Sequence, residues 1–317
     1  MALLILSNDK DSHVDYVVPE IKRRNLNFRV VYTNDYLNTF ALESKINDKE
    51  TIHKLDSLNI EDITSIWYRR PLLRKYEGDN PLYTAYINDE IEGYTTYFFN
   101  SLINKLWISN PAKIELARNK IIQLAHAKEL GISIPPTLIT TDISSFNEFY
   151  KINTERVIIK SIKGHWYDNM NGNDYLFFTR LLDKSKLPTK ESLELAPCLF
   201  QGYVEKDFEL RVTVIGDKVF SAALYSQEDK DSKIDWRLGT RRIKHESYQL
   251  PMELEKKLKN MNKKLGINFG AYDLIVDKEG KFVFLEVNPN GQWVWIQERT
   301  GLKIKEALVD LLQYGEN

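Results

Sequence analysis

The chain has 317 residues, 43% of them hydrophobic, which is enough for two or three packed domains. Its 44 Lys and Arg residues nearly balance 45 Asp and Glu residues, which excludes a protein dedicated to nucleic acid, because such proteins carry excess positive charge. The single cysteine, Cys198, and five scattered histidines exclude a disulfide framework and a zinc site, and they favour a cytoplasmic protein.

Three short apolar runs open the chain, at residues 1–6, 28–33 and 63–68, and they predict a parallel α/β sheet. The first run is too short for a signal-peptide core, and no later run approaches the roughly 20 apolar residues of a membrane span, so no membrane partner is expected. No glycine occurs before Gly78, and no P-loop spacing occurs anywhere. A bound nucleotide would therefore need a scaffold other than the dinucleotide-binding or P-loop folds.

The middle of the chain predicts helices and then a flap. Residues 82–106 are rich in aromatic and aliphatic residues and predict one or two helices. A further helix is predicted from Pro111 to a stop at Gly131, followed by a linker over residues 132–136. Residues 157–160 predict a buried strand that ends in a charge. The polar stretch after it predicts a hairpin or flap whose second strand covers residues 175–179.

The last third of the chain predicts a strand series with two helices. Strands are expected at residues 199–204, 210–214 and 219–225, and a helix at residues 254–265. Two more strands, at residues 271–276 and 282–287, flank a turn at residues 277–280, and a helix over residues 307–312 closes the chain.

The strongest chemical signal lies in the hairpin near the end of the chain. Asp273 lies in one apolar strand, and Glu286 and Asn288 lie two residues apart in the next, so the latter two share a face. The turn places Asp273 across from the Glu286 end, and two carboxylates with an amide oxygen are ligands that magnesium prefers. The alternative is an amphipathic hairpin with solvated charges. Against it, both acids interrupt apolar runs, and a buried acid without a cation is costly.

Five further features of the sequence fit a nucleotide. Lys160 at a strand end suits a polyphosphate, and Lys120 lies in an amphipathic helix. The alternative interpretation of each residue is an ordinary lysine whose side chain is solvated. The segment 201–205 could follow an adenine edge, Glu209 could accept from ribose hydroxyls, and Arg211 faces the same side and could reach phosphate. A hairpin with a salt-bridged rim is the alternative for this segment.

In this combination and order the residues resemble the ATP-grasp superfamily over roughly residues 110–317. The resemblance implies an α/β ATP-grasp fold of two α+β subdomains that clasp ATP, preceded by a Rossmann-like parallel α/β domain. The expected domains are residues 1–110, residues 111–198 with the flap, and residues 199–317 with the metal site. The resemblance implies ATP-phosphate contacts for Lys120 and Lys160, adenine contacts for Gln201, Tyr203 and Val204, a ribose contact for Glu209, and two Mg²⁺ ions on Asp273, Glu286 and Asn288.

Two segments make the chain similar to the microviridin or graspetide peptide maturases. They are residues 67–71, Trp-Tyr-Arg-Arg-Pro, and the tail formed by residues 269–276 and 284–293. The resemblance implies an enzyme that phosphorylates Asp or Glu side chains of a ribosomal precursor peptide and joins them to a Thr or Ser hydroxyl or a Lys amine. It also implies guidance by a leader segment and a homodimer. The flap and residues 190–195 are the expected leader contacts.

The implied mechanism assigns catalytic roles to three residues. Lys160, with Lys120, would balance the phosphate charge, while Arg211, helped by Arg237, would stabilise the oxyanion of the second step. Arg69 and Arg70 could grip acidic side chains of the peptide, since a guanidinium matches a carboxylate. Salt bridges between the first domain and the rest of the protein are the alternative for these two arginines.

Two other functions remain open from the sequence. One is a ligase that adds free amino acids to a protein tail or a small acid, and a requirement for a precursor leader would distinguish the two ligases. The other is a nucleotide-binding regulatory module without catalysis. The intact Asp273, Glu286 and Asn288 argue against that module.

Overall fold

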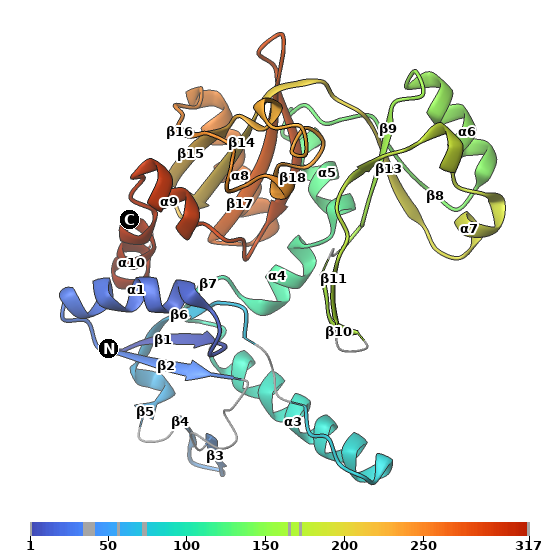
Figure 1. Cartoon of the computed structure of the whole chain (residues 1–317). Helices are drawn as coiled ribbons and strands as arrows, with labels where there is room; N and C mark the ends of the chain where they lie inside the picture. Colours follow the sequence, from blue (N-terminus) through green and yellow to red (C-terminus); the bar gives the residue numbers. More distant parts are fainter. Residues whose placement is uncertain are drawn as a thin grey trace. The chain divides into compact units, whose positions relative to one another are not determined.

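The computed structural model describes residues 2–33, 42–55, 58–71, 75–163, 166–170 and 173–315 (Figure 1). The chain forms two compact units, Met1–Ala112 with Lys303–Asn317, and Lys113–Leu302. The helix at the end of the chain is thus grouped with the first unit, whereas the sequence assigned it to a last segment of residues 199–317. The expected boundaries at residues 110 and 198 stay predictions.

A parallel four-stranded sheet forms the centre of the first unit, as the apolar runs predicted. Its order is β2–β1–β6–β7, with bounds Phe28–Tyr32, Ala2–Ser7, Ile63–Tyr68 and Leu106–Ile108. All six residues of β1 are buried, because helices cover the sheet. These helices are α1 (Ser12–Arg23), α3 (Pro81–Ser101) and α10 (Ile304–Tyr314).

Polar contacts hold α10 against the first unit. Ser65 Oγ on β6 donates to Leu312 O at 2.6 Å, and Arg24 Nη1 lies 2.7 Å from Asp310 Oδ1. A separate antiparallel sheet belongs to the same unit, with β3 (Leu42–Ile46), β4 (Thr51–Leu55) and β5 (Leu58–Asn59), followed by the short helix η1 (Ile60–Asp62).

The second unit contains two larger antiparallel sheets. The central sheet has the order β12–β9–β13–β8, with bounds Arg180–Leu181, Val157–Lys160, Cys198–Gly202 and Thr137–Thr140. The helices α6 (Ile143–Ile152), η2 (Lys184–Lys186) and α7 (Lys190–Glu194) accompany it, and Phe146, Leu193 and Phe200 pack in one core between α6, α7 and the sheet. The hairpin of β10 (Trp166–Met170) and β11 (Asn173–Leu176) forms its own two-stranded sheet.

The other sheet of this unit has five strands in the order β16–β15–β14–β17–β18. Their bounds are His245–Ser247, Lys218–Leu224, Lys206–Ile215, Phe269–Asp277 and Phe282–Asn288. Leu258 and Met261 of the helix α8 (Met252–Leu265) pack on alternate residues of β14, which places the core on one face of the sheet and leaves the other face for polar groups. The remaining helices are α4 (Pro111–Ala117), α5 (Lys120–Glu129), α9 (Val294–Thr300), η3 (Ser226–Glu228) and η4 (Trp236–Leu238).

Two predicted elements were wrong in their bounds. The single helix expected from Pro111 to Gly131 is divided into α4 and α5, because the side chain of Asn119 caps a new start and Lys120 N donates to Ile162 O at 3.3 Å. The strand expected over residues 175–179 ends at Leu176, and Thr179 N donates to a side chain in another loop. Within the described ranges, no helix is long and apolar enough to cross a membrane.

Candidate active site

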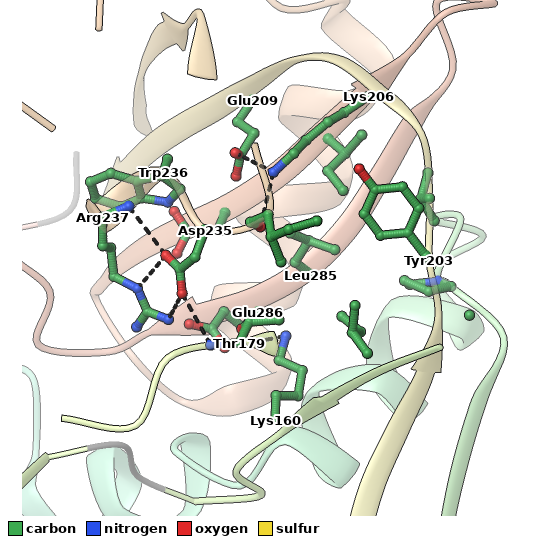
Figure 2. A pocket seen from close by; sticks show the side chains of 17 residues that line it. Lys160, Thr179, Tyr203, Lys206, Glu209, Asp235, Trp236, Arg237, Leu285 and Glu286 are labelled. Atoms are coloured by element: carbon green, nitrogen blue, oxygen red, sulfur yellow. Dashed lines mark hydrogen bonds and ion pairs between the residues drawn. The ribbon is translucent and has the colours of Figure 1, made fainter. Parts of the chain in front are cut away.

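A cleft lies in the second unit, between the central sheet and the five-stranded sheet (Figure 2). Strands β9, β14, β17 and β18 line it, together with residues 202–204 at the end of β13 and residues 234–237 of the loop between β15 and β16. Most of the residues that the sequence assigned to nucleotide, metal or catalysis lie here or beside it. Lining residues from that set are Lys160, Tyr203, Val204, Glu209, Arg237, Asp273 and Glu286.

One face of the five-stranded sheet carries the charged centre of the cleft. The register pairs Arg211 with Asp273 and Asp273 with Glu286, so three charged side chains lie across neighbouring strands. Arg211 Nη1 donates to Asp273 Oδ1 at 3.0 Å, and Arg211 Nη2 donates to Gln292 O at 3.0 Å. A bulge in β18 at Leu285 turns both Leu285 and Glu286 toward the cleft, where strict alternation would admit only one of them.

Two lysines from separate elements converge on one carboxylate oxygen. The Nζ atoms of Lys120 and Lys160 lie 3.5 and 3.6 Å from Glu286 Oε2, and both lysine side chains are only 8% exposed. Burial lowers the pKa of Lys160, Glu286 opposes this shift, and Lys120 adds to it. Two ammonium groups that share one carboxylate leave unbalanced positive charge at the cleft, which suits the phosphates of a nucleotide.

The residues expected to hold magnesium fit that ion chemically. Burial raises the pKa of Asp273, although Arg211 opposes the shift, so an added cation would favour its charged form. Asn288 pairs with Ala271 two residues beyond Glu286, and its Oδ1 accepts from Asn290 N at 3.0 Å. No group of three or more His, Cys, Asp or Glu residues able to hold a metal occurs in the described part of the chain. Asp273, Glu286 and Asn288 would offer two carboxylates and an amide oxygen, the kinds of ligand that magnesium prefers.

Glu209 lies in a buried polar cluster on the same face. It is 3% exposed, and its Oε1 accepts from Lys206 Nζ at 2.5 Å and from Ser226 Oγ at 2.8 Å. Burial raises the pKa of Glu209, while the charge of Lys206 opposes the shift. Lys206 Nζ also donates to Ile234 O at 3.1 Å, so this lysine joins the sheet to the loop above the cleft.

The segment after β13 supplies the wall expected to face adenine. Tyr203 and Val204 line the cleft, and the guanidinium of Arg156 lies 4.5 Å from the Tyr203 ring centroid. Gln201 is 1% exposed and its Nε2 donates to Thr137 Oγ1 at 3.0 Å on β8, so this side chain is directed at the central sheet.

Arg237 reaches the cleft from the loop between β15 and β16. Its Nε donates to Asp235 Oδ1 at 2.7 Å, and its Nη2 donates to Asp235 Oδ2. Although burial opposes the charge, the hydrogen bonds and charge of Asp235 raise the pKa of Arg237 above its ordinary value. Arg237 is therefore a fixed cation on the wall of the cleft.

Arg69 and Arg70 lie in the first unit, at the end of β6. Arg69 is 1% exposed, and its Nε lies 3.0 Å from Asp11 Oδ2 at the start of α1. Arg70 has a left-handed backbone with φ of 47°, and its carbonyl accepts from Asn8 Nδ2 at 2.7 Å. This ion pair of Arg69 lies within the first unit, whereas the alternative placed it between the first domain and the rest of the protein. Arg70 is the more exposed of the two residues.

Sequence reasoning missed three residues of the site. The first is Lys206. It lies three residues before Glu209 in a strand, so the two side chains should face opposite sides of the sheet, but a bulge between Lys206 and Phe208 places them on the same side. Nothing in the local sequence indicates this bulge. Asp235 precedes the predicted Arg237 by two residues, and this spacing of an acid and a base was the one available hint. Gln123 lies one turn after Lys120 in the same helix and carries no sequence signal.

The side chain of Gln123 binds the strand that carries the expected metal ligands. Its Oε1 accepts from Val287 N at 2.9 Å and its Nε2 donates to Val287 O at 2.8 Å, while Nε2 also donates to Ala117 O at 2.6 Å. Val287 stands between Glu286 and Asn288 on the edge strand β18. The side-chain amide of Gln123 therefore makes the hydrogen bonds to Val287 that a neighbouring strand would make, and it fixes Glu286 relative to the helix that carries Lys120.

Solved structures with the same fold include a ligase in complex with a peptide and a macrocyclase. The chain is 26% identical to a RiPP-associated ATP-grasp ligase from Chryseobacterium gregarium in complex with ADP and a leader and core peptide, with a TM-score of 0.88 over 98% of this chain and 96% of the other. It is 29% identical to the macrocyclase MdnB from Microcystis aeruginosa, with a TM-score of 0.82 over 99% of both chains.

Sequence comparison finds ligases as well. A probable alpha-L-glutamate ligase of Mannheimia succiniciproducens is 25% identical over 213 residues, which are 65% of this chain and 67% of that protein. The family model of the RimK-like ATP-grasp domain matches residues 116–312, more than half of the chain and nearly all of the second unit. The chain belongs to the RimK-like ATP-grasp family.

Proposed function

We propose that the protein is an ATP-dependent peptide macrocyclase of the graspetide type. It activates Asp or Glu side chains of a ribosomal precursor peptide as acyl phosphates and joins them to a Thr or Ser hydroxyl or a Lys amine of the same peptide. The observation that carries the proposal is the convergence of Lys120 and Lys160 on Glu286, beside the Arg211–Asp273 pair. The likeness to the Chryseobacterium ligase and to MdnB over nearly the whole chain supports a peptide as the substrate.

In the first step, a carboxylate oxygen of the peptide attacks the γ-phosphorus of ATP in line. A new P–O bond forms, the bond from the γ-phosphorus to the β–γ bridging oxygen breaks, and ADP leaves. Lys120 and Lys160 would neutralise the phosphate oxygens, Tyr203 and Val204 would flank adenine, and Glu209 would accept from the ribose. Asp273, Glu286 and Asn288 would hold two magnesium ions, which would offset the negative charge of the phosphates when bound.

In the second step, the hydroxyl or amine attacks the acyl carbon. Its proton and the phosphate leave, so each ring removes the elements of one water from the peptide. Arg211 and Arg237 would stabilise the oxyanion that forms on the carbonyl. Both guanidinium groups are already oriented by carboxylates, which lowers the cost of reorganisation in the transition state.

The peptide itself would be recognised away from the charged centre. We propose leader contacts at the β10–β11 hairpin, including the predicted flap residue His165, which lies outside the described residues, and at α7 with Leu195, whose side chain is 86% exposed. Arg70, with Arg69 behind it, would receive acidic side chains of the core segment. We further propose a homodimer in the cytoplasm, where ATP and ribosomal peptides are both present.

A ligase that adds free amino acids is the second candidate, because the chain resembles a probable alpha-L-glutamate ligase. The two are separated by incubating the protein with ATP, Mg²⁺ and either an acidic precursor peptide with its leader, the same peptide without leader, or free amino acids. Intact mass spectrometry that finds leader-dependent loss of water from the peptide supports the macrocyclase. A mass gain equal to an added amino-acid residue supports the other ligase, and no ATP-dependent product with any acceptor supports a binding module.

A further inference from the structure

Asp235 is a buried carboxylate whose two oxygens receive four N–H groups. It is 5% exposed and caps the short helix η4, where Oδ1 accepts from Arg237 N at 3.1 Å and from Arg237 Nε at 2.7 Å. Its Oδ2 accepts from Arg237 Nη2 and from Thr179 N at 3.2 Å (Figure 2). The carboxylate thus joins two segments that lie 56 residues apart in the sequence.

Through its contacts with Arg237, Asp235 determines which edge of the guanidinium group faces the cleft. The acid occupies the Nε–Nη2 edge, and no hydrogen bond joins Nη1 to another residue in the part of the chain that the structure describes. Arg237 lines the same cleft as Lys160 and Glu286. The Nη1 edge is therefore the edge that can donate to an oxygen of a bound ligand.

Asp235 and Arg237 also touch the exit of the β10–β11 hairpin. Thr179 N donates to Asp235, and the Phe178 ring lies 5.7 Å from the Arg237 guanidinium carbon, within the range of a cation–π contact. Both residues lie in the short connection between β11 and β12, and β12 is an edge strand of the central sheet. The hairpin pairs with no other strand within the described ranges, so this exit ties it to the cleft.

The loop that carries Asp235 has anchors of its own. At its base, Arg242 Nε lies 2.6 Å from Asp229 Oδ2, and Ser232 Oγ donates to Asp229 Oδ1 at 2.9 Å. Closer to the cleft, Lys206 Nζ donates to Ile234 O. Loss of the Asp235 charge should therefore release the guanidinium without unfolding the loop.

We infer that Asp235 is a positioning residue that links the exit of the hairpin to the Arg237 guanidinium and so couples the peptide-binding hairpin to acyl transfer. The inference rests on the proposed function and deepens it. A carboxylate is required at this position, because an Asn amide would set N–H groups against the N–H groups of Arg237 or Thr179. Displacement of the hairpin exit would remove Thr179 N from Asp235 and allow the Arg237 guanidinium to change its orientation. A movement of the hairpin would therefore alter the orientation of Arg237 at the reaction centre.

The test is a double-mutant cycle of Asp235→Asn and Arg237→Gln, measured as the rate of ring formation and the KM for the precursor. We expect Asp235→Asn to lower kcat about 10- to 100-fold, the range of one to two lost charge-assisted hydrogen bonds. In the Arg237→Gln background the same change should alter kcat less than about two-fold, because the group on which it acts is gone. Asp231→Asn is the matched control, since Asp231 lies in the same loop and its side chain is 56% exposed.

A second variant keeps the inference testable should Asp235→Asn unfold, which thermal unfolding would reveal. Phe178→Leu removes the ring beside Arg237 and should lower kcat about two- to five-fold, again only when Arg237 is present. Equal rates for Asp235→Asn and Asp231→Asn would overturn the inference, as would a full effect of Asp235→Asn or Phe178→Leu in the Arg237→Gln background. A wild-type protein that forms no ring from any precursor would overturn the proposed function instead, and the inference with it.

Discussion

The substitution Gln123→Met tests whether α5 positions the strand that carries Glu286 and Asn288. Methionine has nearly the same length and no amide, so it removes three hydrogen bonds and leaves Val287 N, Val287 O and Ala117 O buried without that partner. Gln123 is 1% exposed and Val287 is 3% exposed, so water cannot readily replace the amide. At about 1 kcal/mol for each bond, the free energy of unfolding should fall by about 3 kcal/mol.

The same substitution should raise the Mg²⁺ concentration needed for activity. Outer partners of metal ligands contribute about 10- to 100-fold to metal affinity or activity, and Gln123 holds the backbone between two of the proposed ligands. The assays are urea denaturation followed by circular dichroism, and ADP release titrated with Mg²⁺ at saturating ATP and precursor. Gln249→Met is the control, because Gln249 makes only partly exposed contacts beside α8. An unchanged Mg²⁺ requirement and unchanged stability in Gln123→Met would refute the positioning argument.

Three further predictions follow from the structure. Lys206→Met should lower the free energy of unfolding by about 3 kcal/mol in urea denaturation, because Glu209 would keep a buried charge without its cation, and Glu209→Gln in the same chain should restore part of the loss. Burial lowers the pKa of His13 from 6.5 to about 4, so between pH 6.5 and pH 4 the imidazole binds a proton only in the unfolded chain. The free energy of unfolding should fall by up to about 3 kcal/mol as the pH drops from 6.5 to 4, and His13→Gln should make it nearly independent of pH over this range. An equal fall in the His13→Gln variant would assign the pH dependence to other groups. Gly291→Ala would place a methyl group 2.7 Å from Arg211 Nη2, so ADP release at saturating ATP should slow about 10-fold or more, and an unchanged rate would show that Arg211 can shift without loss.

Much of the cleft could be expected from local sequence because its parts lie on regular strands. The turn at residues 277–280 fixed the pairing of Asp273 with Glu286, and the structure has this pairing. Lys160 ends a short buried strand, as its apolar neighbours indicated. In the first unit, three apolar runs were enough to predict a parallel sheet, since such strands are buried on both faces.

The remaining features depend on breaks in regularity and on contacts between distant segments. The bulge between Lys206 and Phe208 changes which residues share a face, and nothing in the local sequence marks it. Gln123 and Val287 are 164 residues apart, and Asp235 and Thr179 are 56 apart. Periodicity reports only neighbours on one element, so contacts of this kind emerge only from the folded chain.

The most direct test of the proposed function compares Glu286→Gln with Glu279→Gln in the precursor assay. Both changes replace a carboxylate by an amide on the same hairpin, but Glu286 is the meeting point of Lys120 and Lys160, whereas Glu279 lies exposed in the turn. Intact mass spectrometry should show water loss from the precursor with wild type and Glu279→Gln, and an unmodified peptide with Glu286→Gln. Rings formed by Glu286→Gln at the wild-type rate would contradict the assignment of the reaction to this cleft.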